Sequence, residues 1–166
     1  MGQKVNPIGL RVGISKTWNS KWYAGKDYPE QLKQDLSIQK FVKKRLKHAA
    51  ISHIEVERTA KKTKVNIFTA RPGIIIGRKG DEVERLKHEL NKLTRHEVIV
   101  NIKEIKRPEI DATLVAENIA NQLERRIAYR RAIRRAMTSA MRMNIAGCKI
   151  MVLSLIHISE PTRLTC

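Results

Sequence analysis

The sequence predicts an α+β fold, and three features of the chain support that prediction. Two neighbouring segments, 51–58 and 63–70, alternate apolar and polar residues, which is the period of a half-buried strand. A helical segment, 81–95, and a third alternating segment, 97–105, come next. A long helical stretch, 111–144, follows them. We therefore expect a three-stranded sheet packed with helices, with a basic arm before it and a helix pair after it.

The arm, residues 1–37, opens with a segment, Met1 to Asp27, that shows no clear period. It mixes lysines and arginines with glycines, Pro7 and the aromatic residues Trp18, Trp22 and Tyr23. We interpret it as irregular, with aromatic rings that either pack on the following domain or stack on bases.

The first domain, residues 38–106, is predicted to open with a helix from Ile38 to Ala49, for which Ser37 is the expected N-cap. The apolar stripe of this helix lies opposite a lysine face, which is either simply solvated or part of a binding surface: Lys40, Lys43, Lys44 and Lys47. The loop 59–62 between the first two predicted strands is short, so we expect them to pair antiparallel.

Residues 107–152 are predicted to begin a second α/β domain. Asp111 caps the long helical stretch, but the apolar stripe turns by roughly a quarter circle along it. We therefore expect two helices with a break near Ala128. Gly147 is a stop signal, and Cys148 to Val152 is predicted to be a first strand.

The charge of the chain indicates the kind of partner. The sequence has 34 Lys+Arg and 16 Asp+Glu, a formal net charge of +18. A packed core requires no such excess, so the partner should be a polyanion. No apolar run approaches the ~20 residues of a membrane helix, and the N-terminus lacks the apolar region of a signal peptide. We expect no membrane contact and a cytoplasmic location.

The sequence predicts no metal or cofactor site. The two cysteines, Cys148 and Cys166, form no Cys-x-x-Cys motif, and the five histidines are scattered. No catalytic residue, cofactor or small-molecule substrate is therefore expected.

The loop Gly77-Arg78-Lys79-Gly80 is the first candidate binding site. Its glycines let backbone N–H groups approach a phosphate, while Arg78 and Lys79 add charge and hydrogen-bond donors. The spacing fits neither a Walker loop nor a dinucleotide fingerprint. The order of elements around the loop resembles the type 2 K-homology (KH) domain, whose Gly-x-x-Gly loop clamps about four nucleotides.

A helix rich in arginine is the second candidate site. Between Arg125 and Arg142 there are seven arginines and no acid. Such a face repels itself unless phosphates neutralise it, and arginine favours bidentate phosphate contacts and stacking on unpaired bases. We expect this face to grip single-stranded or looped RNA through Arg126, Arg130, Arg131, Arg134 and Arg135.

At the level of whole motifs, the chain resembles the family of bacterial small-subunit ribosomal protein number three. The blocks that carry the resemblance span about residues 1–152: MGQKVNP (1–7), GLR (9–11), WNS (18–20), TARPG (69–73), GRKG (77–80), QLERR (122–126) and YRRA (129–132).

The resemblance implies a role in the ribosome. The family binds rRNA in the lower part of the subunit head, beside other head proteins, and lines the channel through which mRNA enters. The positions that match its mRNA-contacting helix are Arg130, Arg131 and Arg134. Additional rRNA contacts are expected at Lys4, Arg11, Lys16 and Arg71. Unwinding of mRNA in this family is a property of the whole ribosome, so the chain is not expected to be an enzyme.

Residues 153–166 depart from the family. They resemble the translation of a transposase sequencing adapter, so we expect a non-native tail joined to a truncated chain and assign it no function. The alternative function is a KH-domain regulator of transcription elongation or RNA turnover outside the ribosome. Such a regulator would share the glycine loop but neither the arm nor the arginine helix.

Overall fold

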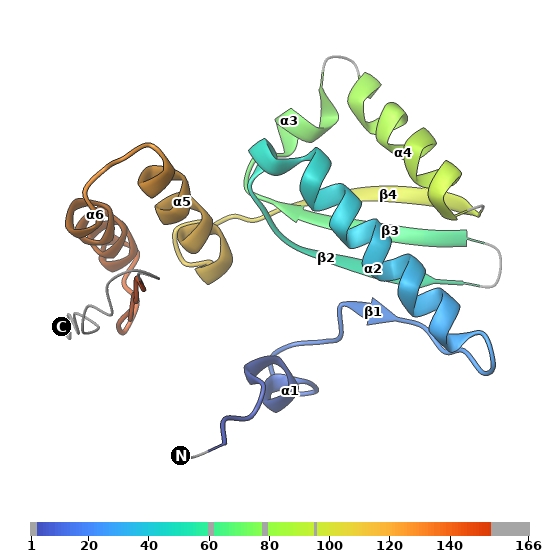
Figure 1. Ribbon diagram of the computed structural model, residues 1–166, viewed down its shortest axis with the longest axis horizontal. Coiled ribbons are helices and arrows are strands. Elements are labelled where there is room, and N and C mark those ends of the chain that lie inside the picture. Colours follow the sequence, from blue (N-terminus) through green and yellow to red (C-terminus); the bar gives the residue numbers. More distant parts are fainter. Residues whose placement is uncertain (1–2, 60–61, 78–79, 95, 154–166) are drawn as a thin grey trace. The chain divides into compact units, whose positions relative to one another are not determined.

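The computed structural model describes residues 3–59, 62–77, 80–94 and 96–153 (Figure 1). The chain divides into two compact units, Met1–Ile105 and Lys106–Cys166.

A four-stranded sheet of order β1-β2-β3-β4 forms the centre of the first unit. Its strands are β1 (Ser20–Lys21), β2 (Ile51–Arg58), β3 (Lys62–Thr69) and β4 (Glu97–Glu104). β2 and β3 pair antiparallel, whereas β3 and β4 are parallel. The three expected strands and the antiparallel hairpin are confirmed. The arm adds the two-residue strand β1, which pairs in parallel with β2 and was not expected.

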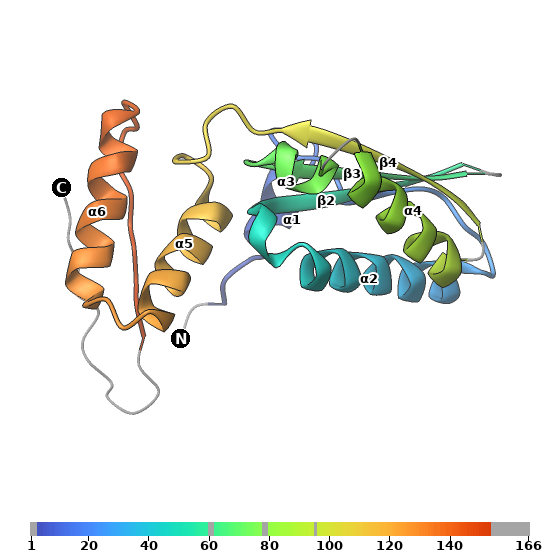
Figure 2. The ribbon, with the colours of Figure 1, turned by 90° about the horizontal axis from the view of Figure 1, so that it is seen from above.

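Helices α2 (Tyr28–Arg45) and α4 (Asp81–Thr94) lie on one face of this sheet (Figure 2). α3 (Pro72–Ile76) precedes α4 on the crossover between β3 and β4. The apolar stripes of these elements bury one continuous core: Ile38, Val42, Ala49, Ile51, Ile54, Val56, Val65, Ile67, Ile75, Leu86, Leu90 and Val98. This α+β arrangement is the type 2 KH fold.

The start of α2 differs from the expectation. The helix begins at Tyr28, with Pro29 in its first turn, rather than at Ile38. Ser37 is not an N-cap, because it lies inside the helix and its Oγ donates a 2.8 Å hydrogen bond to the carbonyl of Lys33. The boundary drawn at residue 37 therefore falls within α2, which is followed by the short 3-10 helix η1 (Lys47–Ala49).

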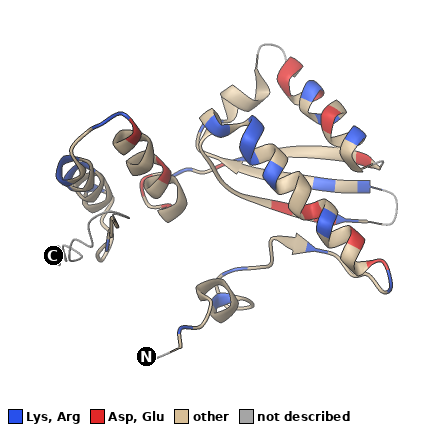
Figure 3. Ribbon diagram, in the orientation of Figure 1, with Lys and Arg blue, Asp and Glu red and all other residues tan. Residues whose placement is uncertain are grey.

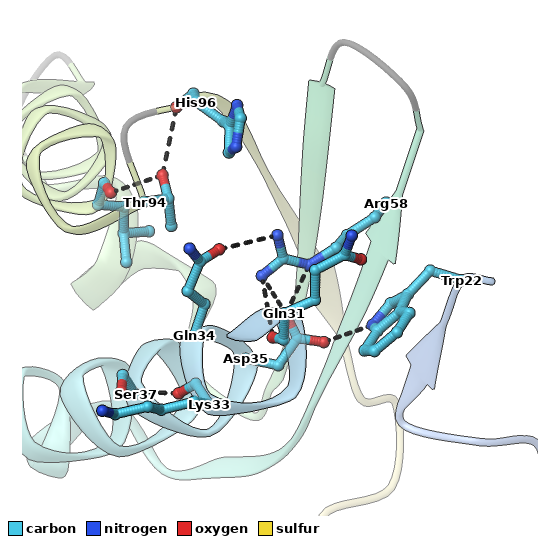
Figure 4. Close-up of polar contacts among 10 residues, drawn as sticks. Trp22, Gln31, Lys33, Gln34, Asp35, Ser37, Arg58, Thr94 and His96 are labelled. Carbon is cyan, nitrogen blue, oxygen red and sulfur yellow. Dashed lines mark hydrogen bonds and ion pairs between the residues drawn. The ribbon is translucent and has the colours of Figure 1, made fainter. Parts of the chain in front are cut away.

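A buried ion pair joins α2 to the sheet (Figure 4). The side chain of Asp35 is 1% exposed, and that of its partner Arg58 on β2 is 10% exposed. Arg58 Nη1 also donates to Gln34 Oε1 at 3.1 Å, and Nη2 donates to the Gln31 carbonyl at 3.4 Å. Arg58 is consequently a structural cation, with its donors directed into the protein.

The arm is partly ordered by local contacts. α1 (Pro7–Arg11) is capped by Asn6, whose Oδ1 accepts from the Ile8 amide at 2.9 Å. Trp22 packs on the domain, since its Nε1 donates to Asp35 Oδ2 at 2.6 Å and its ring lies 5.3 Å from that of Tyr28. Tyr23, in contrast, is 97% exposed. The packing interpretation is thus right for Trp22.

The second unit contains α5 (Ala112–Glu124) and α6 (Tyr129–Arg142), which pack against each other. The Asp111 cap is confirmed, because its Oδ1 accepts from the amides of Thr113 and Leu114 at 2.9 and 3.3 Å. The helix break near Ala128 is confirmed as well.

The strand predicted at Cys148 to Val152 is wrong: these residues are in no regular element. A strand requires a neighbour for its backbone hydrogen bonds, and no segment of the unit's described residues pairs with this one. Within the described ranges, no helix combines the length and apolarity needed to cross a membrane.

Candidate nucleic-acid interface

Both glycines of the predicted phosphate loop have backbones that favour glycine. Gly77 has φ +69° and Gly80 has φ +89°, values that L side chains rarely adopt. A Cβ on Gly77 would also lie 2.8 Å from Glu82 Cγ. The backbone at both ends of the loop therefore favours glycine over a residue with a side chain. Its basic residues, Arg78 and Lys79, lie outside the described residues.

The approach to the loop is fixed by Thr69. The buried Thr69 Oγ1 donates to the carbonyl of Ala49 at 2.6 Å and accepts from the amide of Arg71 at 3.0 Å. Arg71 is exposed just before α3, and Gly77 ends that helix with an amide that donates to Gly73 O at 3.0 Å. Arg71 and the glycine loop are thus placed at opposite ends of one short rigid helix.

Two exposed isoleucines beside the loop were missed from the sequence. Ile75 is completely buried and anchors α3, whereas Ile74 is 46% and Ile76 is 44% exposed. The run Ile74 to Ile76 suggests an apolar turn, but a single helical turn can direct only part of such a run inward. The short length of this segment was therefore the sequence feature that could have indicated the exposure of Ile74 and Ile76. The two exposed side chains give the loop an apolar flank.

The helix that follows the loop begins with acids. Asp81, Glu82 and Glu84 occupy the first turn of α4, where carboxylates stabilise the helix dipole. Glu82 also pairs with Arg85 at 3.5 Å. The first turn of α4 therefore carries negative charge and does not itself favour phosphate.

On the other face of the sheet, both sides of the Phe68 ring are occupied by neighbouring side chains. His53 on β2, Phe68 on β3 and Lys103 on β4 stand in one cross-strand row. The rings of His53 and Phe68 stack with centroids 4.1 Å apart, and Lys103 Nζ lies 5.0 Å from the Phe68 centroid. Since its neighbours come from opposite sides, Phe68 has no free ring face on which a base could stack.

In the second unit, α6 has a buried apolar side and an exposed side that carries arginines. Ala132, Ile133 and Ala140 are buried. The arginines of the helix are all exposed, namely Arg130, Arg131, Arg134, Arg135 and Arg142. None of them forms an ion pair with another residue in the described part of the chain; Arg130 instead lies 5.7 Å from the ring of Tyr129 and donates to its hydroxyl at 3.1 Å.

Positive charge dominates the described part of this unit. Residues 106–153 contain ten Lys and Arg against four Asp and Glu, a net charge of 10 − 4 = +6. Ala128 provides no side-chain cap, and Arg130 and Arg131 sit in the first turn, where the helix dipole already disfavours cations. The arginines in the N-terminal half of α6 thus repel one another and the positive end of the helix dipole. A bound anion would reduce this repulsion.

Arg126 ends α5 in a position usually taken by glycine. Its φ is +60°, its amide donates to Leu123 O at 2.8 Å, and the next amide, of Ile127, donates to Gln122 O at 3.1 Å. These two bonds define a Schellman motif with arginine at the left-handed residue. The side chain of Arg126 is exposed at the corner between α5 and α6.

The candidate cations of the arm are all exposed. Arg11 and Lys16 are neighbours, since the Lys16 amide donates to Arg11 O at 3.1 Å, while Lys4 precedes α1. The Arg11 guanidinium also donates to the Pro7 carbonyl at 3.1 Å. Within the described ranges, no group of three or more His, Cys, Asp or Glu side chains could hold a metal ion.

The fold and the glycine loop together define a KH-domain protein, a class of RNA-binding proteins. Comparison with protein families agrees, because residues 37–110 match the KH domain. Among curated proteins, the chain is 61% identical over 150 residues to small ribosomal subunit protein uS3 of Geobacter sp. (strain M21) and to that of Geotalea uraniireducens (strain Rf4). Each match covers 90% of this chain and 71% of the relative. The uS3 of Syntrophus aciditrophicus (strain SB) is 57% identical, with 90% and 69% covered. The chain belongs to the small ribosomal subunit protein uS3 family.

Proposed function

We propose that this chain is a structural constituent of the small ribosomal subunit. In this proposal it binds rRNA in the lower part of the head and helps hold mRNA at the channel through which mRNA enters the subunit. Membership of the uS3 family supports the ribosomal assignment. The observation that most directly supports RNA binding is the row of exposed arginines on α6. These arginines lack acidic partners among the described residues.

The proposed contacts divide between the two units. The loop Gly77-Arg78-Lys79-Gly80 clamps an rRNA backbone, with bases lying on Ile74 and Ile76. Lys4, Arg11, Lys16 and Arg71 add phosphate contacts. The exposed apolar side chains of the arm contact neighbouring ribosomal proteins of the head: Val5, Leu10, Ile14 and Trp18.

The exposed arginine side of α6, together with Arg126, is the proposed contact for mRNA. Arg130, Arg131 and Arg134 lie on one side of the helix, so their guanidinium groups can follow successive phosphates of a single strand. No catalytic step is part of this role, because holding a strand requires only charge and stacking.

The test is a triple substitution, Arg130→Ala, Arg131→Ala and Arg134→Ala, in the 166-residue chain. Binding to an unstructured single-stranded RNA should become less dependent on salt, with the slope of log K against log salt falling by roughly 0.7 for each phosphate that is no longer neutralised. The charge-matched control replaces Lys64, Lys87 and Lys92, three exposed cations of the KH domain. An unchanged slope and affinity in the α6 variant, or an equal change in the control, would contradict the proposal.

A further inference from the structure

A second row of cations runs along the exposed side of α2 and is used by none of the contacts proposed above. It consists of Lys33, Lys40, Lys43 and Lys44 on α2, with Lys47 following in η1. These five residues form the α2 lysine ridge. At 1.5 Å per residue, the part from Lys33 to Lys44 extends for about 16 Å. The opposite side of the helix holds the buried Asp35, Ile38 and Val42.

The charge of the ridge is not compensated within the domain. Glu30 lies one turn before Lys33, Asp35 is buried against Arg58, and residues 36–50, which include the other four lysines, contain no acid. Arg45, which flanks the ridge, pairs with Glu89 of α4 at 3.6 Å. None of the five lysines forms an ion pair with another residue in the portion of the chain that the structure describes.

Helix α4, in the same layer, shows what a solvated face of this domain looks like. Figure 3 shows acidic and basic positions alternating along α4. Its exposed lysines, Lys87 and Lys92, are interspersed with acids, and Glu82 pairs with Arg85 at 3.5 Å. Solvation alone thus yields mixed charges in this layer, whereas the α2 lysine ridge has one sign.

The composition of the ridge indicates the form of its partner. Lysine is a compact point charge suited to phosphates, and it lacks the planar fork and stacking surface of arginine. Recognition of single strands depends on aromatic side chains on which bases stack. The exposed side chains between Lys33 and Lys40 on this side of the helix are Leu36 and Ser37, and Phe41, which lies between Lys40 and Lys43, packs against the core. A straight row of point charges therefore fits a regular line of phosphates whose bases are already paired.

We infer that the α2 lysine ridge binds the phosphate backbone of an RNA duplex without reading its bases. This inference rests on the proposed function, in that it assumes an RNA partner, but it concerns a surface separate from the glycine loop and α6. The chain then has a contact for double-stranded RNA on the outside of the KH domain as well as its contacts for unpaired strands.

The experiment compares two charge-matched double variants of the 166-residue chain. Lys40→Gln with Lys44→Gln removes two ridge cations, and Lys87→Gln with Lys92→Gln removes two from α4. Glutamine preserves helix propensity in both cases, which circular dichroism would verify. Each protein is titrated with a mixed-sequence RNA duplex and with an unstructured single strand of equal length over a range of salt concentrations.

The ridge variant should lower the duplex slope of log K against log salt by about 2, one for each phosphate left without its lysine, and leave single-strand binding nearly unchanged. The α4 variant should leave both slopes as in the parent. Equal loss in the two variants, or a loss confined to the single strand, overturns the inference. A polyglutamate peptide that binds the ridge more tightly than the duplex overturns it too.

The same titrations separate this inference from the proposed function. If the α6 triple variant loses RNA affinity while the ridge variant does not, the ridge assignment fails alone. If the parent chain binds neither RNA, both proposals fail.

Discussion

Arg58 donates two hydrogen bonds, from Nε at 2.8 Å and from a terminal nitrogen, to the same carboxylate oxygen of Asp35. The second oxygen of Asp35 accepts from Trp22 at 2.6 Å. One buried carboxylate therefore holds together the sheet, the helix that covers it and the arm that precedes it.

Replacing Asp35 with alanine should lower the free energy of unfolding by about 3–5 kcal/mol, because it leaves the buried guanidinium of Arg58 unpaired. Replacing Glu89 of α4 with alanine removes a surface ion pair with Arg45 of α2. This change should alter the free energy of unfolding by less than ~1 kcal/mol. Urea unfolding followed by circular dichroism measures both values. An Asp35→Ala protein as stable as the Glu89→Ala protein would show that the network contributes little.

Gly77→Ala should destabilise the KH domain by about 1–2 kcal/mol from backbone strain, plus the contact of the new methyl group with Glu82. Gly73→Ala is the matched control, because Gly73 lies inside α3, has no positive φ, and would carry a methyl group with nothing within 4 Å of it. That variant should be neutral or more stable by roughly 0.5–1 kcal/mol. Thermal unfolding of the two variants tests the difference, and an equal response would contradict the loop geometry.

Arg126→Gly should change stability and binding in opposite directions. Glycine relieves the left-handed strain at the end of α5, so the second unit should gain on the order of 1 kcal/mol. RNA binding should weaken, with the salt slope falling by about 0.7 because one phosphate is no longer neutralised. Arg125→Gly removes the same charge at an ordinary φ of −80° and should bring no gain in stability. If Arg126→Gly leaves RNA binding unchanged, Arg126 does not contribute to RNA binding and the prediction is wrong.

The second unit should open more readily than the first. Its buried apolar residues are few and include two alanines: Leu114, Ile119, Ala132, Ile133 and Ala140. The first unit, by contrast, has a continuous core of branched side chains. Hydrogen exchange should therefore be faster in α5 and α6 than in β2 and β3. Equal protection in both units would contradict this expectation.

Local signals account for what the sequence predicted well. The strand pair followed from alternation at Ile54, Val56, Val65 and Ile67, and all four are buried. The break between α5 and α6 followed from a change in direction of the apolar stripe. Asp111 was recognisable as a cap because its side chain bonds to amides only two and three residues ahead.

What the sequence did not predict depends on distant partners. The first part of α2 packs on the domain through the bond between Asp35 and Arg58, which is far along the chain, so the apolar period alone placed the start of the helix too late, at Ile38. Strand β1 has two residues, too few for any alternation, and exists because it lies beside β2. Ser37 was misleading for the opposite reason, since its local capping preference was overridden by a longer helix.

The parallel pairing of β3 with β4 affects the order in which the parts of the domain fold. Parallel neighbours cannot be joined by a tight turn, so β3 and β4 are linked by a long crossover that includes α3 and α4. Contacts of such large sequence separation form late during folding, after the local hairpin of β2 and β3. We therefore expect Gly77 and Gly80, which lie on this crossover, to reach their folded positions only when β4 has paired with β3.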